Sequence, residues 1–391
     1  MALAPLRVGL LWHSASSGNL GVAALTVANL SIARGVAAEL GLRPSFTIIG
    51  MRDGERPYVD APDVETFVVD TRSLLSPGGS WSVFKRLDCV LDIGGGDSFA
   101  DIYGAKRFGF LWLTKMMAIA RRKPLLLSPQ TIGPFTSAPY KLAARVAMER
   151  ATAVVARDRQ SFEVLQALAP RAKAVLATDV AFALPFEDRS AERREGRLRV
   201  GVNISGLLFT DAEAGGNRFA LDFNYAELMR RLIQELSKRE GVDLHFFAHV
   251  AASDNPTDDD ARVIQRIARD YPGAHVEPAF ASPSDAKSYM SSLDFVISGR
   301  MHACIGAFSA GVPVVPISYS RKFAGLFGSL GYDWLVPTNG MGTEAAAEFI
   351  LSAIDKRETL RSDAAKAMQS VSGLLDRYRA ELAQLFREAR N

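Results

Sequence analysis

LRVGLLWHSASSGNLGVAALTVANLSIARGVAAEL, residues 6–40, is the stretch that decides the fold. A short apolar run, Leu6–Leu11, ends in the serine- and glycine-rich turn Ser14–Gly21, and apolar residues then recur at helical spacing from Val22 to Leu40. This order of strand, glycine loop and helix is typical of a doubly wound α/β domain, in which ligands bind beyond the carboxyl ends of the strands. The loop lacks the G-x-G-x-x-G spacing of dinucleotide-binding proteins, so the sequence gives NAD binding little support.

Strand and helix patterns alternate along the rest of the chain in two blocks. In the first block we expect further strands at 45–49, 66–69, 89–93, 124–128 and 153–156, and helices at 103–121, 139–150 and 159–168. In the second block we expect strands at 199–204, 243–248, 275–276, 295–298 and 314–317, and helices at 225–240, 258–271, 283–291 and 301–310. Alternation of this kind predicts parallel sheets covered by helices.

The length of 391 residues exceeds what one compact core usually holds, which favours two domains. Residues 186–197 are polar and lack apolar periodicity, so we interpret them as a linker between an N-terminal domain, 1–185, and a C-terminal domain, 198–342. Residues 343–391 read as charged, alanine-rich helices that pack back onto the domains. The predicted fold class is therefore α/β, with two Rossmann-like domains facing each other across a cleft in a GT-B-like arrangement.

Composition excludes several classes of protein. The net charge is only +3, from 46 Lys and Arg against 43 Asp and Glu, so we expect no nucleic-acid partner. The two cysteines, Cys89 and Cys304, lie in apolar segments and support neither a disulfide framework nor a metal site. The N-terminus runs directly into a strand without the pattern of a signal peptide. The most apolar stretch, Phe108–Ala120, contains Lys115 and is shorter than the ~20 residues of a membrane span, so the sequence predicts a cytoplasmic protein.

Two loops of the first block carry candidate binding residues. Gly94, Gly95 and Gly96 follow a buried strand and precede Asp97. Consecutive glycines allow a ligand to approach the backbone and expose amides to an oxyanion, although they also permit a sharp bend without a ligand. We favour the ligand role because Asp97 would lie at the mouth of the sheet, where it can accept a hydrogen bond from a sugar hydroxyl or act as a base. On a neighbouring strand end, Gln130 could orient a hydroxyl.

Another predicted strand of the first block is followed directly by a charged residue, Arg157. Its planar guanidinium could bind a carboxylate or phosphate, or it could form a structural ion pair, and the sequence leaves both open. The next residue, Asp158, is better explained as the N-cap of the following helix.

The strongest local signal lies in the second block. A buried strand stops at Ser298-Gly299, and Arg300 and His302 fall in the first turn of the next helix, whose dipole favours an anion. Tyr319 and Lys322 follow the next strand. Cationic side chains gathered at one sheet edge repel one another unless an anion is bound, so we expect a small, multiply charged ligand there, such as phosphoenolpyruvate.

Two polar segments of the second block have simpler explanations. His245 and His249 point to one face of a strand, but no third metal ligand is evident, so packing, or lining of the cleft by His249, is preferred. The run Asp258-Asp259-Asp260 is interpreted as a solvated helix start rather than a cation site.

Taken together, these segments resemble the polysaccharide pyruvyl transferase family. The resemblance follows the order of Gly18–Gly21, Gly94–Asp97, Gln130–Pro134, Arg157-Asp158, Thr178–Phe182, Gly299–His302 and Tyr319–Lys322. It implies an enzyme that moves a pyruvyl group from phosphoenolpyruvate, as co-substrate and without a cofactor or metal, onto a sugar. The acceptor would belong to a cell-surface or extracellular polysaccharide or its lipid-linked precursor.

The resemblance also implies roles for individual residues. The N-terminal domain would hold the acceptor and the C-terminal domain the donor substrate. The implied donor-binding residues are Arg157, Arg300, Met301, His302, Tyr319 and Lys322, and the implied acceptor-binding residues are Asn19, Gly95, Gly96, Asp97 and Gln130. His302 is the candidate acid, because histidine titrates near neutral pH. Lys322 and Asp97 complete the implied catalytic set, with Asp97 the weaker candidate for the base.

One departure from the family pattern leaves alternatives open. The position after the Asn19–Gly21 turn, where the family often has an acid, is Val22. The alternatives are a GT-B glycosyltransferase that uses a nucleotide sugar, and an inactive family member that binds glycans. A lipid-linked acceptor would place the enzyme at the inner face of the membrane, where the basic run Arg121–Lys123 could contact anionic headgroups; a solvated helix end explains that run equally well. The sequence gives no signal for the oligomeric state.

Overall fold

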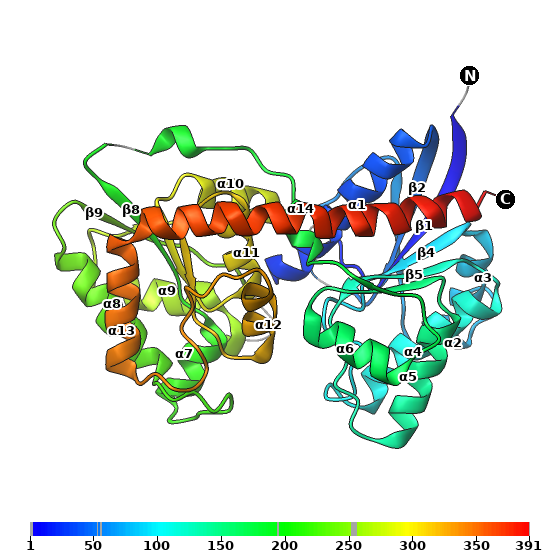
Figure 1. Cartoon of the computed structure of the whole chain (residues 1–391), viewed down its shortest axis with the longest axis horizontal. Coiled ribbons are helices and arrows are strands. Elements are labelled where there is room, and N and C mark those ends of the chain that lie inside the picture. The colour runs from blue at the N-terminus through cyan, green and yellow to red at the C-terminus, as the bar shows by residue number, and fades with distance from the viewer. Residues whose placement is uncertain (1–2, 53, 55–56, 194, 252–255, 391) are drawn as a thin grey trace. The chain divides into compact units, whose positions relative to one another are not determined.

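A computed structural model of the chain describes residues 3–52, 54, 57–193, 195–251 and 256–390. The described residues form two compact units, each built on a parallel β-sheet (Figure 1). The first unit runs to Ser17, from Leu25 to Ala183 and from Val371 onwards. The second contains Gly18–Ala24 and Leu184–Ser370. A short piece of the N-terminal region therefore packs with the C-terminal half of the chain.

The sheet of the first unit has seven described strands in the order β3-β2-β1-β4-β5-β6-β7, all parallel. The strands are β1 (Ala4–Leu11), β2 (Leu42–Gly50), β3 (Val64–Val68), β4 (Cys89–Asp92), β5 (Leu125–Gln130), β6 (Ala153–Ala156) and β7 (Ala174–Leu176). The helices between them are α1 (Leu20–Glu39), α2 (Thr71–Leu75), α3 (Ser80–Arg86), α4 (Ala105–Ala120), α5 (Ala138–Arg150) and α6 (Arg159–Leu168). The central strands β4, β5 and β6 are buried throughout, as expected for a parallel sheet covered on both faces.

Two helices of this unit bear on the question of a membrane span. By length and composition α1 could cross a membrane, yet 72% of its apolar window is buried, as in the core helix of an α/β domain. In α4, Lys115 is fully buried and pairs with Asp92 at 2.8 Å. The lysine that interrupts the apolar stretch Phe108–Ala120 is therefore part of an internal ion pair.

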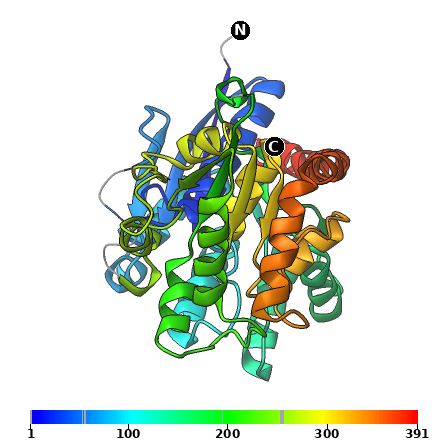
Figure 2. The same ribbon diagram turned by 90° about the vertical axis from the view of Figure 1, so that its left-hand side faces the viewer.

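The sheet of the second unit has five described parallel strands in the order β10-β9-β8-β11-β12. The strands are β8 (Leu198–Asn203), β9 (Val242–Phe246), β10 (His275–Val276), β11 (Phe295–Ser298) and β12 (Val314–Pro316). The helices are α7 (Gly206–Glu213), α8 (Tyr225–Lys238), α9 (Asp260–Ala268), α10 (Pro283–Ser291), α11 (Met301–Ser309), α12 (Arg321–Ser329), α13 (Thr343–Asp355) and α14 (Arg357–Glu388). Figure 2 shows α8 and α13 side by side against this sheet. The prediction of two parallel α/β domains is confirmed.

The last helix, α14, packs back as predicted, because its residues from Val371 onwards belong to the first unit. The buried Tyr378 hydroxyl donates to Asn29 Oδ1 at 2.6 Å and lies 3.0 Å from Ser128 Oγ. Asn29 Nδ2 in turn lies 2.9 Å from Nε2 of His13. Three segments distant in sequence are thus joined by one buried polar network beneath the carboxyl end of β1.

His13 makes the stability of this network depend on pH. Burial lowers its pKa to about 4, from an ordinary value of 6.5. Between these two values the unfolded chain binds a proton that the folded chain does not, so stability falls as pH falls through this window. The full shift corresponds to about 3 kcal/mol. We expect denaturant unfolding to show a loss of stability from pH 7 to pH 4.5. The loss should be smaller in His13→Asn, and an equal loss in that variant would contradict the assignment.

The sequence prediction lacks five elements: β7, α2, α3, α7 and α12. All are short, from three to nine residues, so the chain offers too few turns or alternations for a periodic pattern to emerge. Two residues of the predicted linker, Glu187 and Arg189, are bound to α10 in the second unit. The backbone N–H of Glu187 donates to Ser288 Oγ at 2.9 Å, and that of Arg189 donates to Ser291 Oγ at 2.8 Å.

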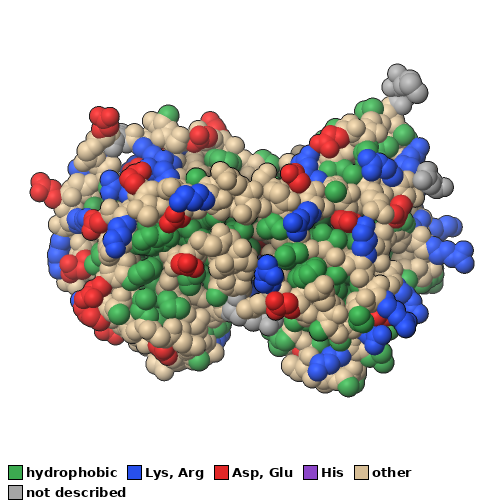
Figure 3. Space-filling view, viewed as in Figure 1, with side chains coloured by type: hydrophobic (Ala, Val, Ile, Leu, Met, Phe, Trp, Pro, Cys, Tyr) green, Lys and Arg blue, Asp and Glu red, His purple; other side chains and the backbone are tan. Residues whose placement is uncertain are grey.

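Acidic and basic side chains both occur over the face of the molecule in Figure 3.

Candidate functional site

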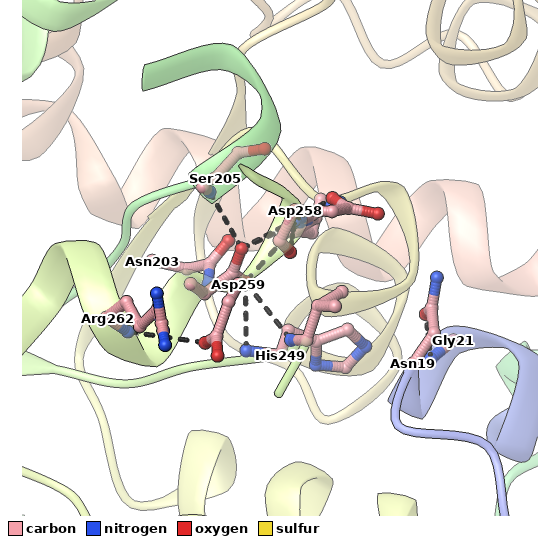
Figure 4. Close-up of polar contacts among 12 residues, drawn as sticks. Asn19, Gly21, Asn203, Ser205, His249, Asp258, Asp259 and Arg262 are labelled. Carbon is pink, nitrogen blue, oxygen red and sulfur yellow. Dashed lines mark hydrogen bonds and ion pairs between the residues drawn. The ribbon is translucent and has the colours of Figure 1, made fainter. Parts of the chain in front are cut away.

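The second unit gathers polar side chains at the carboxyl ends of β8, β9 and β11. At their centre lies the Asp260 carboxylate, which is fully buried at the start of α9. Its oxygens accept hydrogen bonds from the Asn203 side chain (3.0 Å) and the backbone N–H groups of Gly206 (2.9 Å), His249 and Val250 (both 3.1 Å). Figure 4 shows Asn203 and His249 at this group. The carboxylate thereby fixes the loops that follow two neighbouring strands.

Arg300 completes the group from the end of β11. Its Nη2 donates to Asp260 Oδ1 at 2.6 Å and to Asp258 Oδ1 at 2.7 Å, and its Nε donates to Asp260 Oδ1 at 3.1 Å. Only 7% of Arg300 is exposed. Burial lowers the pKa of Arg300, but the two carboxylates outweigh burial and raise it above its ordinary value. Arg300 is therefore held as a cation in a fixed orientation.

This arrangement corrects the charge argument made from the sequence. We expected Arg300, His302 and Lys322 to repel one another unless an anion was bound. Arg300 instead has two carboxylate partners of its own, so its presence alone does not require a bound anion. Its assignment to the donor site stays a prediction that needs other support.

The interpretation of Asp258–Asp260 as a solvated helix start is also wrong in part. Asp259 is the N-cap of α9 and accepts from the backbone N–H of Arg262 at 3.2 Å, but Asp260 is inaccessible to solvent. Helix-start acids are usually exposed, and the partner of Asp260, Arg300, lies 40 positions away in the sequence. No local pattern marks the acid as buried.

His302 lies in the first turn of α11, as predicted, and is half-buried. The turn Gly18–Gly21, which belongs to the same unit, packs against it. The Leu20 backbone N–H donates to the His249 carbonyl at 3.1 Å, and the Ala251 N–H donates to the Gly18 carbonyl at 3.0 Å. Asn19 Oδ1 accepts from the Gly21 N–H at 2.9 Å and shapes the turn. The structure therefore places Asn19, a predicted acceptor residue, in the unit that contains His302.

Gly21 is the point of closest approach between this turn and His302. A Cβ atom at position 21 would lie 2.5 Å from His302 Nδ1, so any larger residue must displace the imidazole. We expect Gly21→Ala to reduce turnover by about 100-fold, since small misplacements of reacting groups cost that much. Gly35→Ala, in the same helix α1, is the matched control because its Cβ would meet only Arg379 Nη2 at 3.9 Å. Steady-state phosphate release measures both, and equal rates would show that His302 tolerates displacement.

Three further predicted donor residues belong to the same unit. Met301 is buried at the start of α11. Tyr319 follows β12, packs edge-on against Phe219 with ring centroids 5.0 Å apart, and contributes to the raised pKa of Arg300. Lys322 lies in the first turn of α12 and is half-buried. The direct contacts of Tyr319 and Lys322 with a donor substrate stay predictions.

The first unit holds the glycine loop that was predicted to bind a ligand. Gly94, Gly95 and Gly96 all have positive φ, at 55°, 59° and 87°, so the loop requires glycine at each position. Gln130 Nε2 donates to the Asp92 carbonyl at 2.8 Å, and Asp92 Oδ1 accepts from the Gly94 N–H at 2.8 Å. Gln130 therefore supports the loop, and its predicted contact with a hydroxyl could be made only through Oε1.

The two charged candidates of this unit, Arg157 and Asp97, have different hydrogen-bond partners. Arg157 is buried and its Nη1 donates to Asp179 Oδ2 at 2.7 Å, which is the structural ion pair considered above. A Cβ at Gly96 would lie 3.5 Å from Arg157 Nη1, so the pair adjoins the glycine loop. Asp97 accepts a hydrogen bond from the Tyr103 hydroxyl at 2.7 Å. Asp158 caps α6 through the Ser161 N–H, as predicted.

Comparison with known proteins assigns the family. Residues 34–321 match the profile described as polysaccharide pyruvyl transferase. The chain belongs to this family. Arg157, Arg300 and His302 of this pyruvyl transferase family member lie inside the matched stretch, whereas Asn19 and Lys322 lie outside it. The resemblance stated from the sequence is therefore confirmed for the family, and the roles of single residues stay predictions.

Individual relatives are distant. The amylovoran biosynthesis protein AmsJ of Erwinia amylovora is 20% identical to this pyruvyl transferase family member over 263 residues, which are 63% of this chain and 60% of AmsJ. The chain thus matches less than two thirds of the length of this relative.

Solved structures show the same fold at low identity. Anabaena HepE in complex with UDP and glucose has a TM-score of 0.52, 15% identity and coverage of 96% of this chain and 97% of HepE. The UDP-GlcNAc 2-epimerase of Neisseria meningitidis has a TM-score of 0.53, 12% identity and coverage of 95% of this chain and 100% of the epimerase. At these identities the likeness concerns the fold alone, and it confirms the GT-B class.

Proposed function

We propose that this protein transfers the pyruvyl group of phosphoenolpyruvate to two hydroxyls of one sugar, in a polysaccharide or its lipid-linked precursor. The observation that carries the proposal is the family match over residues 34–321. The similarity to a protein of amylovoran biosynthesis supports a role in polysaccharide formation. The group formed by Asp260, Arg300 and His302 provides a fixed cation and a histidine at the start of α11, where an anion is favoured.

The proposed reaction has two additions. Protonation of C3 of phosphoenolpyruvate makes C2 electrophilic, and the first sugar hydroxyl adds to C2 and loses its proton. The bond between C2 and the phosphate oxygen then breaks, and phosphate leaves. The second hydroxyl adds to C2 and loses its proton, which closes the ketal ring. The net reaction consumes one diol and one phosphoenolpyruvate and yields one cyclic ketal and one phosphate.

The chain supplies acid catalysis and charge to this reaction. His302 would donate the proton to C3, because imidazole is the side chain most often used in general acid catalysis. Nε and Nη2 of Arg300 are committed to Asp260 and Asp258, so Nη1 is the atom with which Arg300 would contact the donor substrate. Lys322 would hold the departing phosphate. Asp97 is the proposed acceptor contact. The amides of the glycine loop, predicted to face an oxyanion, instead donate within the protein: Gly94 to Asp92 Oδ1, Gly95 to the Trp12 carbonyl and Gly96 to the Ile93 carbonyl.

The test is a phosphate-release assay with the purified protein and phosphoenolpyruvate. Sugars and lipid-linked oligosaccharides are screened as acceptors, and mass spectrometry of the acceptor identifies the ketal. We expect phosphate release that depends on the acceptor, together with thermal stabilisation by phosphoenolpyruvate. Stabilisation by UDP-sugars alone would contradict the proposal.

That last outcome would favour the second candidate, a glycosyltransferase that uses a nucleotide sugar. The fold is compatible with it, since HepE was solved in complex with UDP-glucose. A third outcome, with neither donor consumed and glycans bound, would favour an inactive family member, for which Val22 is the motivating residue. The family match is the reason for preferring the pyruvyl transferase.

The proposed acceptor has a consequence for location. If it is lipid-linked, the enzyme would act at the inner face of the cytoplasmic membrane. Within the basic run Arg121–Lys123, however, the Arg121 guanidinium lies over the Trp81 ring at 4.1 Å and its Nε donates to the Trp81 carbonyl at 3.3 Å. This packing gives Arg121 a structural role, so membrane contact stays a proposal for its neighbours.

A further inference from the structure

His249 is the most unusual histidine among the described residues. It is 4% exposed, yet neither ring nitrogen has a hydrogen-bond partner in the described part of the chain. The other two buried histidines do have partners: His13 Nε2 lies 2.9 Å from Asn29 Nδ2, and His245 Nδ1 lies 2.8 Å from the Tyr289 hydroxyl. A buried polar group without a hydrogen-bond partner lowers the stability of the folded protein. Its presence in a native structure therefore calls for an explanation, such as a role in binding.

The backbone contacts of His249 place it beside the candidate donor site. Its backbone N–H donates to Asp260 Oδ2 at 3.1 Å, and its carbonyl accepts from the Leu20 N–H at 3.1 Å. The residue is thus clamped between the carboxylate that orients Arg300 and the turn that packs against His302. Figure 4 shows His249 between the Asp258–Asp259 segment and Asn19 with Gly21. The ring therefore neighbours His302 and Arg300 of the candidate donor site. The sequence predicted packing, or lining of the cleft, for His249 without a contact to a substrate.

The charge state of His249 follows from the same surroundings. Burial first, and then the neighbouring His302 and Arg300, lower its pKa to about 3, although Asp260 opposes them. The ring is therefore neutral at any ordinary pH and carries one N–H group and one acceptor nitrogen. A neutral imidazole can bind an anionic oxygen without adding charge beside Arg300.

We propose that His249 is a substrate-contacting residue of the donor site, whose ring N–H donates a hydrogen bond to an anionic oxygen of phosphoenolpyruvate. This inference rests on the proposed function and adds a residue to it. The bound substrate would provide the partner that the ring lacks among the described residues. His249 then contributes to affinity and orientation, whereas His302 contributes the proton.

The proposal predicts opposite effects on stability and on binding. His249→Leu removes two unpartnered polar atoms and keeps the backbone clamp, so its Tm should equal or exceed that of the wild type. The same variant should bind phosphoenolpyruvate about 10- to 100-fold more weakly, the loss expected for one hydrogen bond to a charged group. His249→Gln, which keeps an N–H group, should recover part of the affinity.

The matched control is His245→Leu, on the same segment of chain. Because His245 has a partner in Tyr289, this variant should lose stability and leave the affinity for phosphoenolpyruvate unchanged. Affinity is measured by titration calorimetry and stability by thermal unfolding. If the wild type binds phosphoenolpyruvate and His249→Leu binds it equally well, the inference is wrong and the proposed function stands. If the wild type does not bind phosphoenolpyruvate, both are overturned.

Discussion

Replacement of His302 by alanine is expected to lower phosphate release from phosphoenolpyruvate and acceptor by about 100- to 10,000-fold, the range that general acid catalysis contributes. The fold should persist, because His302 is only half-buried and the apolar face of α11, with Ala303, Cys304 and Phe308, is untouched. Rapid-mixing and steady-state assays of phosphate measure the rate, and thermal unfolding confirms the fold.

Two further variants separate proton donation from other roles of His302. His302→Gln retains hydrogen bonding but cannot transfer a proton, so it should remain as inactive as the alanine variant. His275→Ala is the control: this exposed histidine on β10 is paired with Glu277 and should be dispensable. Normal turnover in His302→Ala would exclude His302 as the acid and leave the family assignment intact.

The largest effect on stability is expected for Asp260→Ala. Among the described residues, the substitution leaves Asp258 as the one acid partner of the buried Arg300 guanidinium. It also removes the acceptor of the Asn203 side chain and of three backbone N–H groups. Breaking a buried ion pair from one side costs about 3–5 kcal/mol. Hydrogen exchange should localise the loss to residues 203–206 and 247–250 and to the start of α11.

Asp258→Ala is the matched control, because the Asp258 side chain is 26% exposed and its carbonyl still accepts from Arg300 Nη2. We expect it to cost less than about 1 kcal/mol, as partly exposed pairs do. The double variant Asp260→Leu with Arg300→Met removes the unpaired buried charge but leaves Asn203 and the three backbone N–H groups without their acceptor. It should therefore recover part of the stability and no phosphate release. A thermal midpoint of Asp260→Ala equal to that of the wild type would refute the central role of this carboxylate.

The elements that the sequence predicts best are those with clear local start and stop signals. The bounds of β6, β11, α6 and α10 agree with their predicted ranges, because buried parallel strands are continuous apolar runs and these helices begin at clear caps. β7 escapes prediction because it has three residues, all half-buried at the edge of the sheet. Short segments form through their neighbours rather than through their own pattern.

The positions of Arg300 and His302 at a strand end and a helix start were predicted, whereas the ion pairs around Arg300 were not. Arg300 and His302 could be found from the strand end and helix start that place them, a local feature of the sequence. Asp260 could not, because an aspartate at a helix start is usually exposed. For His249 the sequence left packing and lining of the cleft open. Their roles depend on the strand order β9-β8-β11, which brings the loops after β9 and β11 together around the end of β8.

The sequence by itself determined the α/β class, the two parallel sheets, the family and the strand ends from which Arg300 and His302 project, since periodicity and turn residues act over a few neighbouring positions. Only the tertiary structure decided that Asp260 is buried against Arg300, that Gly21 lies against His302, and that both ring nitrogens of His249 lack a partner among the described residues. The first two of these contacts connect residues that are tens to hundreds of positions apart in the sequence. Burial and hydrogen bonding between such positions are set by how strands and loops pack, and no local pattern encodes them.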